Sequence, residues 1–106
     1  MHLHGTSTRL NDLHEARLIE HLFPPQVAVS STKGATGHSL GASGAIGVAF
    51  CLMALKSGYL PLCVGLNDLA FPLNAVINSH KKNPQNALCF SFGFGGQNAI
   101  LAVSKH

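Results

Sequence analysis

The sequence predicts an α/β chain, because it combines two helical segments with short strand-like runs. Residues 11–23 place apolar side chains at helical spacing, and a second, longer apolar stretch follows from about Gly37 to Ser57. Near the end, two strand-like runs flank the glycine-rich stretch GFGG, an arrangement typical of a hairpin. No internal repeat or linker divides the chain, so residues 1–106 are expected to form one unit.

The first helix is expected over residues Asn11–Phe23. Asn11 or Asp12 is the expected N-cap, because a short polar side chain can accept hydrogen bonds from the free N–H groups of the first turn. Pro24 and Pro25 stop the helix, since proline lacks the N–H and clashes with the preceding turn. The next residues, QVAVSS at 26–31, are expected to form a short buried strand.

The second helix is expected from about Gly37 to Ser57, ending at Gly58, a residue type that favours the left-handed C-cap conformation. Its core, Leu40–Leu55, carries no charge, yet it falls short of the ~20 apolar residues that a membrane span needs. The pattern therefore favours a core helix packed on all sides over a membrane helix. Small residues that let another backbone approach closely recur along one side: Gly37, Gly41, Gly44 and Ala45.

Tyr59 to Gln85 is expected to be mostly loop, because three prolines interrupt it and no apolar period is visible. After it, NALCFSF at 86–92 and QNAILAVS at 97–104 are the expected strands of one hairpin, joined by the glycine-rich loop. Most of the expected regular structure therefore lies before residue 58 and after residue 85.

Composition argues against several classes of protein. Charged residues make up 10 % of the chain and hydrophobic residues 46 %, which is too apolar for a disordered segment. The formal charge of +3 comes from scattered side chains, and no basic run interleaved with aromatic residues suggests nucleic acid as a partner. Three cysteines in apolar surroundings are typical of reduced thiols in a cytoplasmic protein. The first twelve residues lack the basic and apolar regions of a signal peptide, so none is expected.

Single residues rule out three common ligand motifs. Thr32, rather than glycine, precedes Lys33, so this run is no phosphate-binding P-loop. Leu18 lies four residues after His14, where a zinc-protease helix needs its second histidine. The run GFGGQN lacks the last glycine of a dinucleotide fingerprint. No metal site and no cofactor is expected, and the histidines of the first helix fit a solvated face.

Three dispersed motifs remain: HGTST at 4–8, KGATGH at 33–38 and GFGGQN at 93–98. In this order and context they resemble the C-terminal end of the β-ketoacyl-acyl-carrier-protein synthases, the condensing enzymes of fatty-acid and polyketide synthesis. The resemblance runs through nearly all of the chain. It implies part of the C-terminal half of a thiolase-like α/β sandwich, an incomplete domain over residues 1–106.

The resemblance implies a catalytic role for His4 and His38. In the family, two such histidines point into one pocket and donate hydrogen bonds to the thioester oxygen of malonyl-carrier protein. Donors already in place stabilise the enolate that forms as carbon dioxide leaves. Lys33 matches the lysine beside that pair, where its charge favours the developing anion. Glu15 matches the acidic partner of that lysine, and Asp12 a second supporting carboxylate.

The resemblance also implies that the glycine-rich loop is a gate. Phe94 matches the residue whose backbone N–H completes the oxyanion hole and whose ring covers the acyl pocket, and neighbouring glycines give such a loop its mobility. Gly95 belongs to the same substrate-binding loop. Thr6 and Thr8 match hydroxyls that contact the pantetheine arm. The implied partner is an acyl carrier protein with phosphopantetheine-linked substrates.

The chain departs from the family pattern at several positions. Arg9 stands where proline is common, Asn11 where glycine is usual, and Phe90 where asparagine is typical. Nothing in the chain corresponds to the family's nucleophile, a cysteine at a strand-to-helix turn. The cysteines present are not expected at a helix N-terminus, which lowers the pKa of a thiol, and burial should raise their pKa instead: Cys51, Cys63 and Cys89.

Two functional classes stay open. In the first, the chain is part of a 3-oxoacyl-acyl-carrier-protein synthase, which carries out decarboxylative Claisen condensation of malonyl-carrier protein with an acyl thioester. Such a part needs a missing N-terminal half or a homo-oligomer partner. In the second, the chain is a non-catalytic truncated remnant or an interaction module. A weaker alternative is a small membrane-associated protein built around Leu40–Leu55.

The resemblance leads to expectations about structure and behaviour that can be tested. His4 and His38 should approach each other near one pocket, lined by Lys33 and Phe94. The chain should expose a sheet edge and apolar helix faces, and should therefore aggregate or require a partner. It should not carry out condensation alone, because it cannot hold an acyl group on an activated thiolate.

Overall fold

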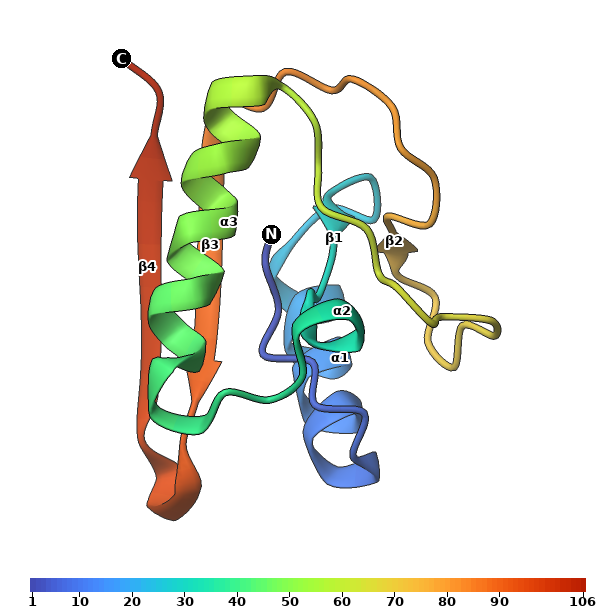
Figure 1. Ribbon diagram of the computed structural model, residues 1–106. Helices are drawn as coiled ribbons and strands as arrows, with labels where there is room; N and C mark the ends of the chain where they lie inside the picture. Colours follow the sequence, from blue (N-terminus) through green and yellow to red (C-terminus); the bar gives the residue numbers. More distant parts are fainter.

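The computed structural model describes residues 1–106 and has the predicted α/β character. Its elements are α1 (Arg9–Leu22), β1 (Ala28–Val29), α2 (Lys33–Thr36), the 3-10 turn η1 (Leu40–Ala42), α3 (Ser43–Ser57), β2 (Asn74–Ala75), β3 (Asn86–Phe92), the 3-10 turn η2 (Phe94–Gly96) and β4 (Asn98–Ser104). They form two connected parts (Figure 1). In one part α3 lies along the hairpin of β3 and β4, and in the other α1, α2, β1 and β2 gather beside the N-terminal segment.

Residues 1–3 form a short strand that joins the two parts. His2 pairs in parallel with Ser30 on one side and with Cys89 on the other. Leu3 N donates to Ser30 O at 2.7 Å, and Phe90 N donates to His2 O at 2.9 Å. Ordered by their hydrogen bonds, the strands run β2, β1, residues 1–3, β3 and β4, and only β4 is antiparallel to its neighbour. Sequence patterns do not predict this strand, because three residues are too few to show a period.

The helix α1 begins two residues earlier than the sequence predicts. Its N-cap is Thr8, whose extended backbone (φ −101°, ψ 141°) precedes the first turn, so the expectation of Asn11 or Asp12 is wrong. Asp12 lies in the first turn instead, where a carboxylate interacts favourably with the positive end of the helix dipole. The helix ends before the two prolines, as predicted. Its buried face consists of Glu15, Ala16 and Ile19.

The helix predicted over Gly37–Ser57 is wrong at its beginning. Gly37 ends α2 with φ 73°, and Leu40 takes φ 50°, so the chain turns twice and α3 begins only at Ser43. The sequence gives no signal for the single turn of α2. The end of α3 is confirmed, because Gly58 caps it in the left-handed conformation with φ 84° and ψ 0°.

Two glycines of α3 let it approach β3 closely. A Cβ on Gly44 would lie 3.3 Å from Ser91 Oγ, and a Cβ on Gly47 would lie 2.7 Å from Cys89 Sγ. The small-residue face is therefore shifted along the helix relative to the prediction. Its other predicted members lie in open or exposed positions: Gly37, Gly41 and Ala45.

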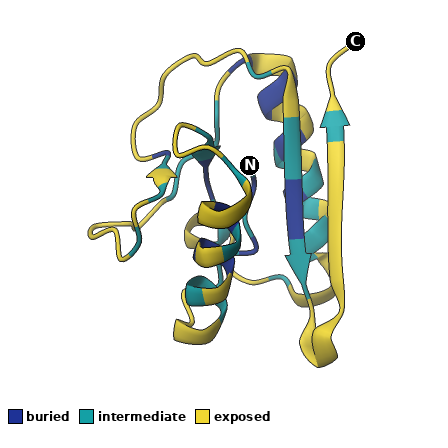
Figure 2. Cartoon of the chain, turned by 180° about the vertical axis from the view of Figure 1, so that it is seen from behind, coloured by how far each residue is buried: buried dark blue, intermediate teal, exposed yellow.

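The expectation that α3 is packed on all sides is wrong for this chain. Leu52 and Met53 are 53 % and 61 % exposed. By length and composition alone, the stretch Leu40–Ser57 would suffice to cross a membrane, and 22 % of it is buried within the chain. Most of the buried residues lie on β3, the inner faces of α1 and α3, the N-terminal segment and residues 29–32, whereas β4 is exposed along nearly all of its length (Figure 2).

The C-terminal hairpin is confirmed. The strands β3 and β4 pair antiparallel from Asn86 with Ser104 to Phe92 with Asn98. The strand predicted at 26–31 is confirmed as β1, shortened to two residues that pair in parallel with β2. Residues 59–85 are mostly loop, as predicted, apart from β2 and one bridge between residues 59 and 81.

Candidate active site

His4 lies just beyond the N-terminal strand, between α1 and α2. Its backbone N–H donates to Glu15 Oε1 at 2.7 Å, and the N–H of Gly5 donates to Glu15 Oε2 at 2.8 Å. The backbone carbonyl of His4 accepts a hydrogen bond from Lys33 Nζ. The residue is buried, with 8 % of its surface exposed. One acidic and one basic side chain therefore fix the backbone from which the imidazole projects.

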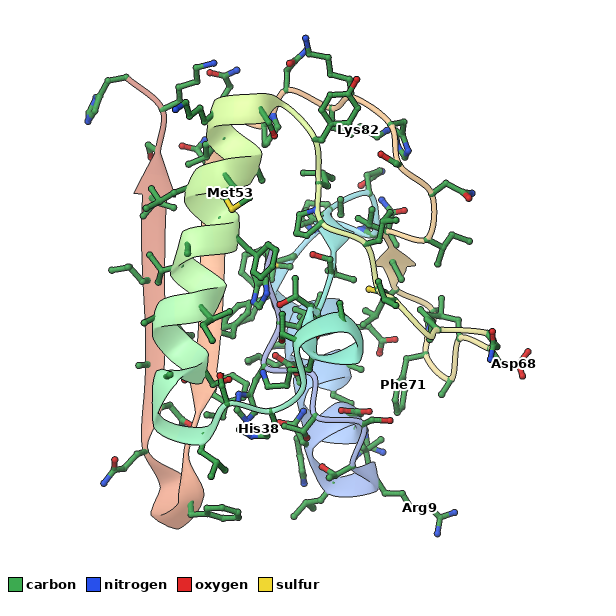
Figure 3. All side chains as sticks on the ribbon, in the orientation of Figure 1. Arg9, His38, Met53, Asp68, Phe71 and Lys82 are labelled. Atoms are coloured by element: carbon green, nitrogen blue, oxygen red, sulfur yellow. The ribbon has the colours of Figure 1, made fainter.

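The imidazoles of His4 and His38 meet edge to face. Their ring centroids are 5.8 Å apart and their planes are inclined at 85°. His38 lies in the loop between α2 and α3 (Figure 3), and its Nδ1 accepts the backbone N–H of Leu40 at 3.0 Å. A neutral imidazole that accepts at Nδ1 carries its proton on Nε2. His38 can therefore donate a hydrogen bond from Nε2, next to the ring of His4.

His4 is an uncharged imidazole at neutral pH. Burial lowers the pKa of His4 from its ordinary value of 6.5, and the charge of Lys33 lowers it further, while Asp12 has the opposite effect. The Nδ1 atom of His4 is buried and has no hydrogen-bond partner in the chain. A buried polar atom without a partner is costly to the fold.

Lys33 and Glu15 do not form the direct pair that the resemblance implies. Lys33 Nζ donates to His4 O, and the Glu15 carboxylate accepts from the N–H groups of His4 and Gly5 and from Asn11 Nδ2 at 3.2 Å. Burial raises the pKa of Glu15, and these donors oppose the rise. Burial lowers the pKa of Lys33, and the charge of Glu15 opposes the fall. The two residues are connected through the backbone of His4 instead.

A cavity of about 600 Å³ lies beside these residues. It brings together two carboxylates, an ammonium group, an imidazole and a hydroxyl that the sequence predicts as site groups: Asp12, Glu15, Lys33, His38 and Thr6. Thr8 does not line the cavity. Its exposed hydroxyl pairs with Thr6 Oγ1 at 2.9 Å.

The structure does not bring Phe94 to the histidine pair. Its side chain is 100 % exposed at the tip of the hairpin. Next to it, Gly95 has φ 78°, and nothing lies within 4 Å of the position that a Cβ would take. The loop is closed by one backbone hydrogen bond, from Gly93 N to Gln97 O at 2.7 Å. The expectation that Phe94 lines the pocket is therefore not met, because no contact within this chain draws the loop inward.

Phe92 occupies the position beside His4 instead. Its ring centroid lies 5.8 Å from that of His4, with the planes at 58°. It also contacts Phe90 at 5.9 Å, and Phe90 is only 4 % exposed. The aromatic residue that replaces the family's asparagine is thus part of the core. The alternation of Phe90, Ser91 and Phe92 along a strand places both rings on one face and could have revealed this contact.

None of the three free cysteines lies at a helix N-terminus. Hydrogen bonding to Cys89, together with burial, raises the pKa of Cys51. The thiol of Cys51 and the imidazole of His2 lower the pKa of Cys89 to about 5, against the effect of burial. Burial acts on the pKa of Cys89 in the expected direction, but the hydrogen-bond donors outweigh it, so the expected net rise is not found at Cys89. No cluster of His, Cys, Asp and Glu side chains has the arrangement of a metal site.

The solved structures that this chain superimposes on include thiolase-like ketosynthases. A β-ketoacyl synthase from Burkholderia phymatum superimposes with a TM-score of 0.93 at 26 % identity, over 99 % of this chain and 27 % of that one. A ketosynthase bound to its chain length factor, from Xenorhabdus doucetiae, superimposes with a TM-score of 0.85 at 34 % identity, over 96 % of this chain and 27 % of that one. The chain therefore forms part of a thiolase-like α/β sandwich.

The family model described as β-ketoacyl synthase, C-terminal domain, matches residues 1–67, and the chain belongs to this family. The 3-oxoacyl-[acyl-carrier-protein] synthase 1 of Escherichia coli K12 is 37 % identical over 106 residues, which cover 96 % of this chain and 26 % of that protein. The mitochondrial synthase of Arabidopsis thaliana is 40 % identical over 111 residues, 96 % of this chain and 24 % of that protein. The chain spans about a quarter of the length of these relatives.

Proposed function

We propose that the chain provides the decarboxylation site of a 3-oxoacyl-acyl-carrier-protein synthase, an acyltransferase of fatty-acid or polyketide synthesis. One observation carries the proposal: the rings of His4 and His38 meet at 5.8 Å, with Lys33 bound to the carbonyl of His4. All three residues lie in the segment that the family model matches. The names of the relatives supply the product, a 3-oxoacyl-acyl-carrier protein. The proposed reaction is the joining of malonyl-carrier protein to an acyl thioester.

The two imidazoles would donate hydrogen bonds to the thioester oxygen of malonyl-carrier protein. When the bond to the malonyl carboxylate breaks, carbon dioxide leaves, and the electron pair forms an enolate with its charge on that oxygen. Donors fixed in position stabilise this charge without reorganising. His4 suits the role because its lowered pKa keeps it neutral, and His38 because its Nδ1 is occupied and its Nε2 carries the proton. Lys33 adds a positive charge beside His4.

Condensation also needs an acyl group held on a cysteine thiolate. Within this chain, Cys51 and Cys89 are buried, and Cys63 faces Val29 O and Ser31 N rather than a helix N-terminus. We propose that the nucleophile comes from the remaining part of a β-ketoacyl synthase, in the same chain, on a second polypeptide or on a second copy.

In this proposal, the acyl carrier protein presents a phosphopantetheine-linked substrate to the cavity beside Lys33 and His38. Thr6, at that cavity, and Thr8, next to it, would contact the pantetheine arm. The exposed loop of Phe94 and Gly95 would close over the acyl pocket once the remaining part is in place, and the backbone N–H of Phe94 would then complete the oxyanion hole. The three reduced cysteines support a cytoplasmic location.

A chimera tests the proposal. The last quarter of the Escherichia coli synthase is replaced by this chain, and release of carbon dioxide from malonyl-carrier protein is measured. We expect decarboxylation, and a loss of about 10²–10³ in rate for His4→Ala or His38→Ala, as is typical when one such donor is removed. His14→Ala and His21→Ala are matched controls, because both residues are exposed on α1, and these variants should keep the activity.

The result that would overturn the proposal is a folded chimera whose His4→Ala and His38→Ala variants decarboxylate as fast as the unmutated form. A folded chimera that releases no carbon dioxide at all would favour the other class, a non-catalytic remnant or an interaction module. One observation supports that class, the full exposure of Phe94 away from the histidine pair.

A further inference from the structure

A second cluster of reactive side chains lies between α3, β3 and the N-terminal strand. It consists of His2, Cys51 and Cys89, which are 5 %, 3 % and 4 % exposed. The proposed decarboxylation uses none of them. A buried histidine beside two buried thiols requires its own explanation, because a polar ring is costly to bury without partners.

Two of the three side chains, those of His2 and Cys89, meet at Gly47. A Cβ there would lie 2.7 Å from Cys89 Sγ and 3.0 Å from His2 Nδ1, so the sulfur and the ring border the same small space. Cys51 follows Gly47 by about one turn on the same face of α3. Its Sγ lies 3.9 Å from the carbonyl oxygen of Leu88, the neighbour of Cys89 on β3. The two sulfurs interact directly across the contact between α3 and β3.

His2 is arranged to favour the ionised form of one sulfur. Its Nε2 lies 3.0 Å from Thr32 Oγ1, and its Nδ1 has no nitrogen or oxygen partner. If the hydroxyl of Thr32 donates to Nε2, the proton of the neutral ring is on Nδ1, on the side of Cys89. Hydrogen bonds from Cys51 and His2 lower the pKa of Cys89, and the charge of Lys33 contributes to this effect. The hydrogen bond between the two thiols raises the pKa of Cys51.

We propose that Cys89 and Cys51 form a peroxide-sensitive thiol pair, in which Cys89 reacts with a hydroperoxide and Cys51 then closes a disulfide between β3 and α3. The contact between α3 and β3 supports the pair, because it places the imidazole of His2 beside Cys89 Sγ at Gly47 and puts Cys51 about one turn further along the same helix face. His2 and Cys51, the two neighbours of Cys89, line a cavity of about 360 Å³ that is large enough for hydrogen peroxide. The inference does not depend on the proposed decarboxylation.

The proposed chemistry balances in two steps. The thiolate of Cys89 attacks one oxygen of the hydroperoxide, an S–O bond forms as the O–O bond breaks, and the departing oxygen takes a proton and leaves as water or an alcohol. Cys89 is then a sulfenic acid. The sulfur of Cys51 attacks the Cys89 sulfur, an S–S bond forms as the S–O bond breaks, and the hydroxyl leaves with the proton of Cys51 as water. Two thiols lose two electrons, and one hydroperoxide gains them.

Oxidation of Cys89 also activates Cys51 for the second step. Cys51 holds its proton because it donates to Cys89 and lies beside a negative charge. A sulfenic acid carries no such charge, so this cause of the raised pKa is removed when Cys89 is oxidised. Cys63 has no comparable neighbours, since its Sγ accepts from Ser31 N at 3.4 Å and lies 3.9 Å from Val29 O.

Peptide mapping tests the pair. The reduced chain is treated with hydrogen peroxide, free thiols are alkylated, and the protein is digested with trypsin. Cleavage at lysine places the three cysteines on separate peptides, 34–56, 57–81 and 83–105. We expect one linked species, 34–56 with 83–105. Cys89 should react roughly tenfold faster in the folded chain than in urea, because the thiolate is the reactive form.

Two variants complete the test. Cys51→Ser should stop the reaction at the sulfenic acid of Cys89, detected as one added oxygen that dimedone traps. Cys63→Ser is the matched control and should form the same disulfide as the unmutated chain. A disulfide that involves Cys63, equal rates in buffer and urea, or an unoxidised Cys89 in Cys51→Ser would each overturn the proposal.

Discussion

Glu15 and Lys33 bind opposite sides of a single backbone residue, His4. Glu15 on α1 accepts its N–H, and Lys33 on α2 donates to its carbonyl. The two charges are thereby spaced by one residue of main chain instead of cancelling in an ion pair. The position of the His4 imidazole consequently depends on both helices. A substitution that moves α1 or α2 should therefore also move the ring of His4.

Replacing Glu15 with glutamine should destabilise the chain by about 1–3 kcal/mol, the cost of leaving a buried N–H without an acceptor. The carboxylate accepts from the N–H groups of His4 and Gly5, whereas an amide has only one oxygen. The lower end of the range is expected, because the amide avoids the burial of a charge. Urea unfolding measures the change, with Glu20→Gln, exposed on the same helix, as the control. Equal destabilisation by the two variants would contradict the assignment.

Gly34→Ala should displace α2 and release Lys33 from His4. A Cβ at residue 34 would lie 1.8 Å from the backbone oxygen of Val64, which cannot move aside as a side chain can. We expect a loss of stability of about 1–3 kcal/mol and a slower decarboxylation in the chimera. Gly41→Ala is the control, because nothing lies within 4 Å of that Cβ. The idea fails if the two variants unfold at the same temperature.

His4 should titrate below pH 6.5 in the folded chain, as followed by the NMR signal of its ring. Since its pKa is lowered on folding, the unfolded state binds more protons below pH 6.5, and the contribution of His4 to stability is lost as the pH falls through that range. Glu15 acts in the opposite sense, because its raised pKa means that stability decreases as the pH rises above 4.5. His4→Gln should therefore reduce the acid sensitivity below pH 6.5. A midpoint at or above 6.5 would refute the burial argument.

The isolated chain should associate through β4. This strand leaves one edge unpaired, and its Ile100 and Leu101 are 53 % and 50 % exposed. Sedimentation should show large assemblies that Ile100→Lys reduces, because a charge on an edge strand disfavours further pairing. Leu10→Lys is the matched control, on a residue that is 72 % exposed on α1. A sharp, cooperative melt of a dilute monomer would be the opposite result.

The chain alone should neither become acylated nor form a condensation product. The Cys89 sulfur is buried out of reach of a pantetheine thioester, in spite of its lowered pKa. A missing oxyanion-hole donor would cost a further 10²–10³ or so in rate. The test is to incubate the chain with acyl-carrier protein or acyl-CoA and to weigh the intact protein. Stoichiometric acylation of a cysteine, followed by turnover with malonyl-carrier protein, would disprove this prediction.

Elements with local signals were predictable from the sequence. The hairpin follows from two alternating runs around a glycine-rich loop, and the end of α3 follows from Gly58. The beginning of α3 was not predictable, because the positive φ of Leu40 opposes the preference of leucine and is imposed by the surrounding chain. The strand at residues 1–3 depends wholly on partners that are distant in the sequence.

The candidate site was predictable only through its motifs. His4 and His38 come together as the motifs imply, but the contact of Phe92 with His4 and the hydrogen bond from Asn11 to Glu15 require the fold. The lowered pKa of Cys89 was missed for the same reason. Burial of a thiol can be inferred from apolar neighbours along the chain, whereas a histidine 87 positions away cannot.

The register of the N-terminal strand determines where both His2 and His4 point. His2 and His4 stand two residues apart on an extended segment and so point to the same side, one toward the thiols and the other toward His38. Four backbone hydrogen bonds hold this segment between β1 and β3. A slip by one residue would turn both rings away and present Leu3 in their place. Inserting or deleting one residue here would therefore remove His2 and His4 together from the two proposed sites, although every side chain of both sites would still be present.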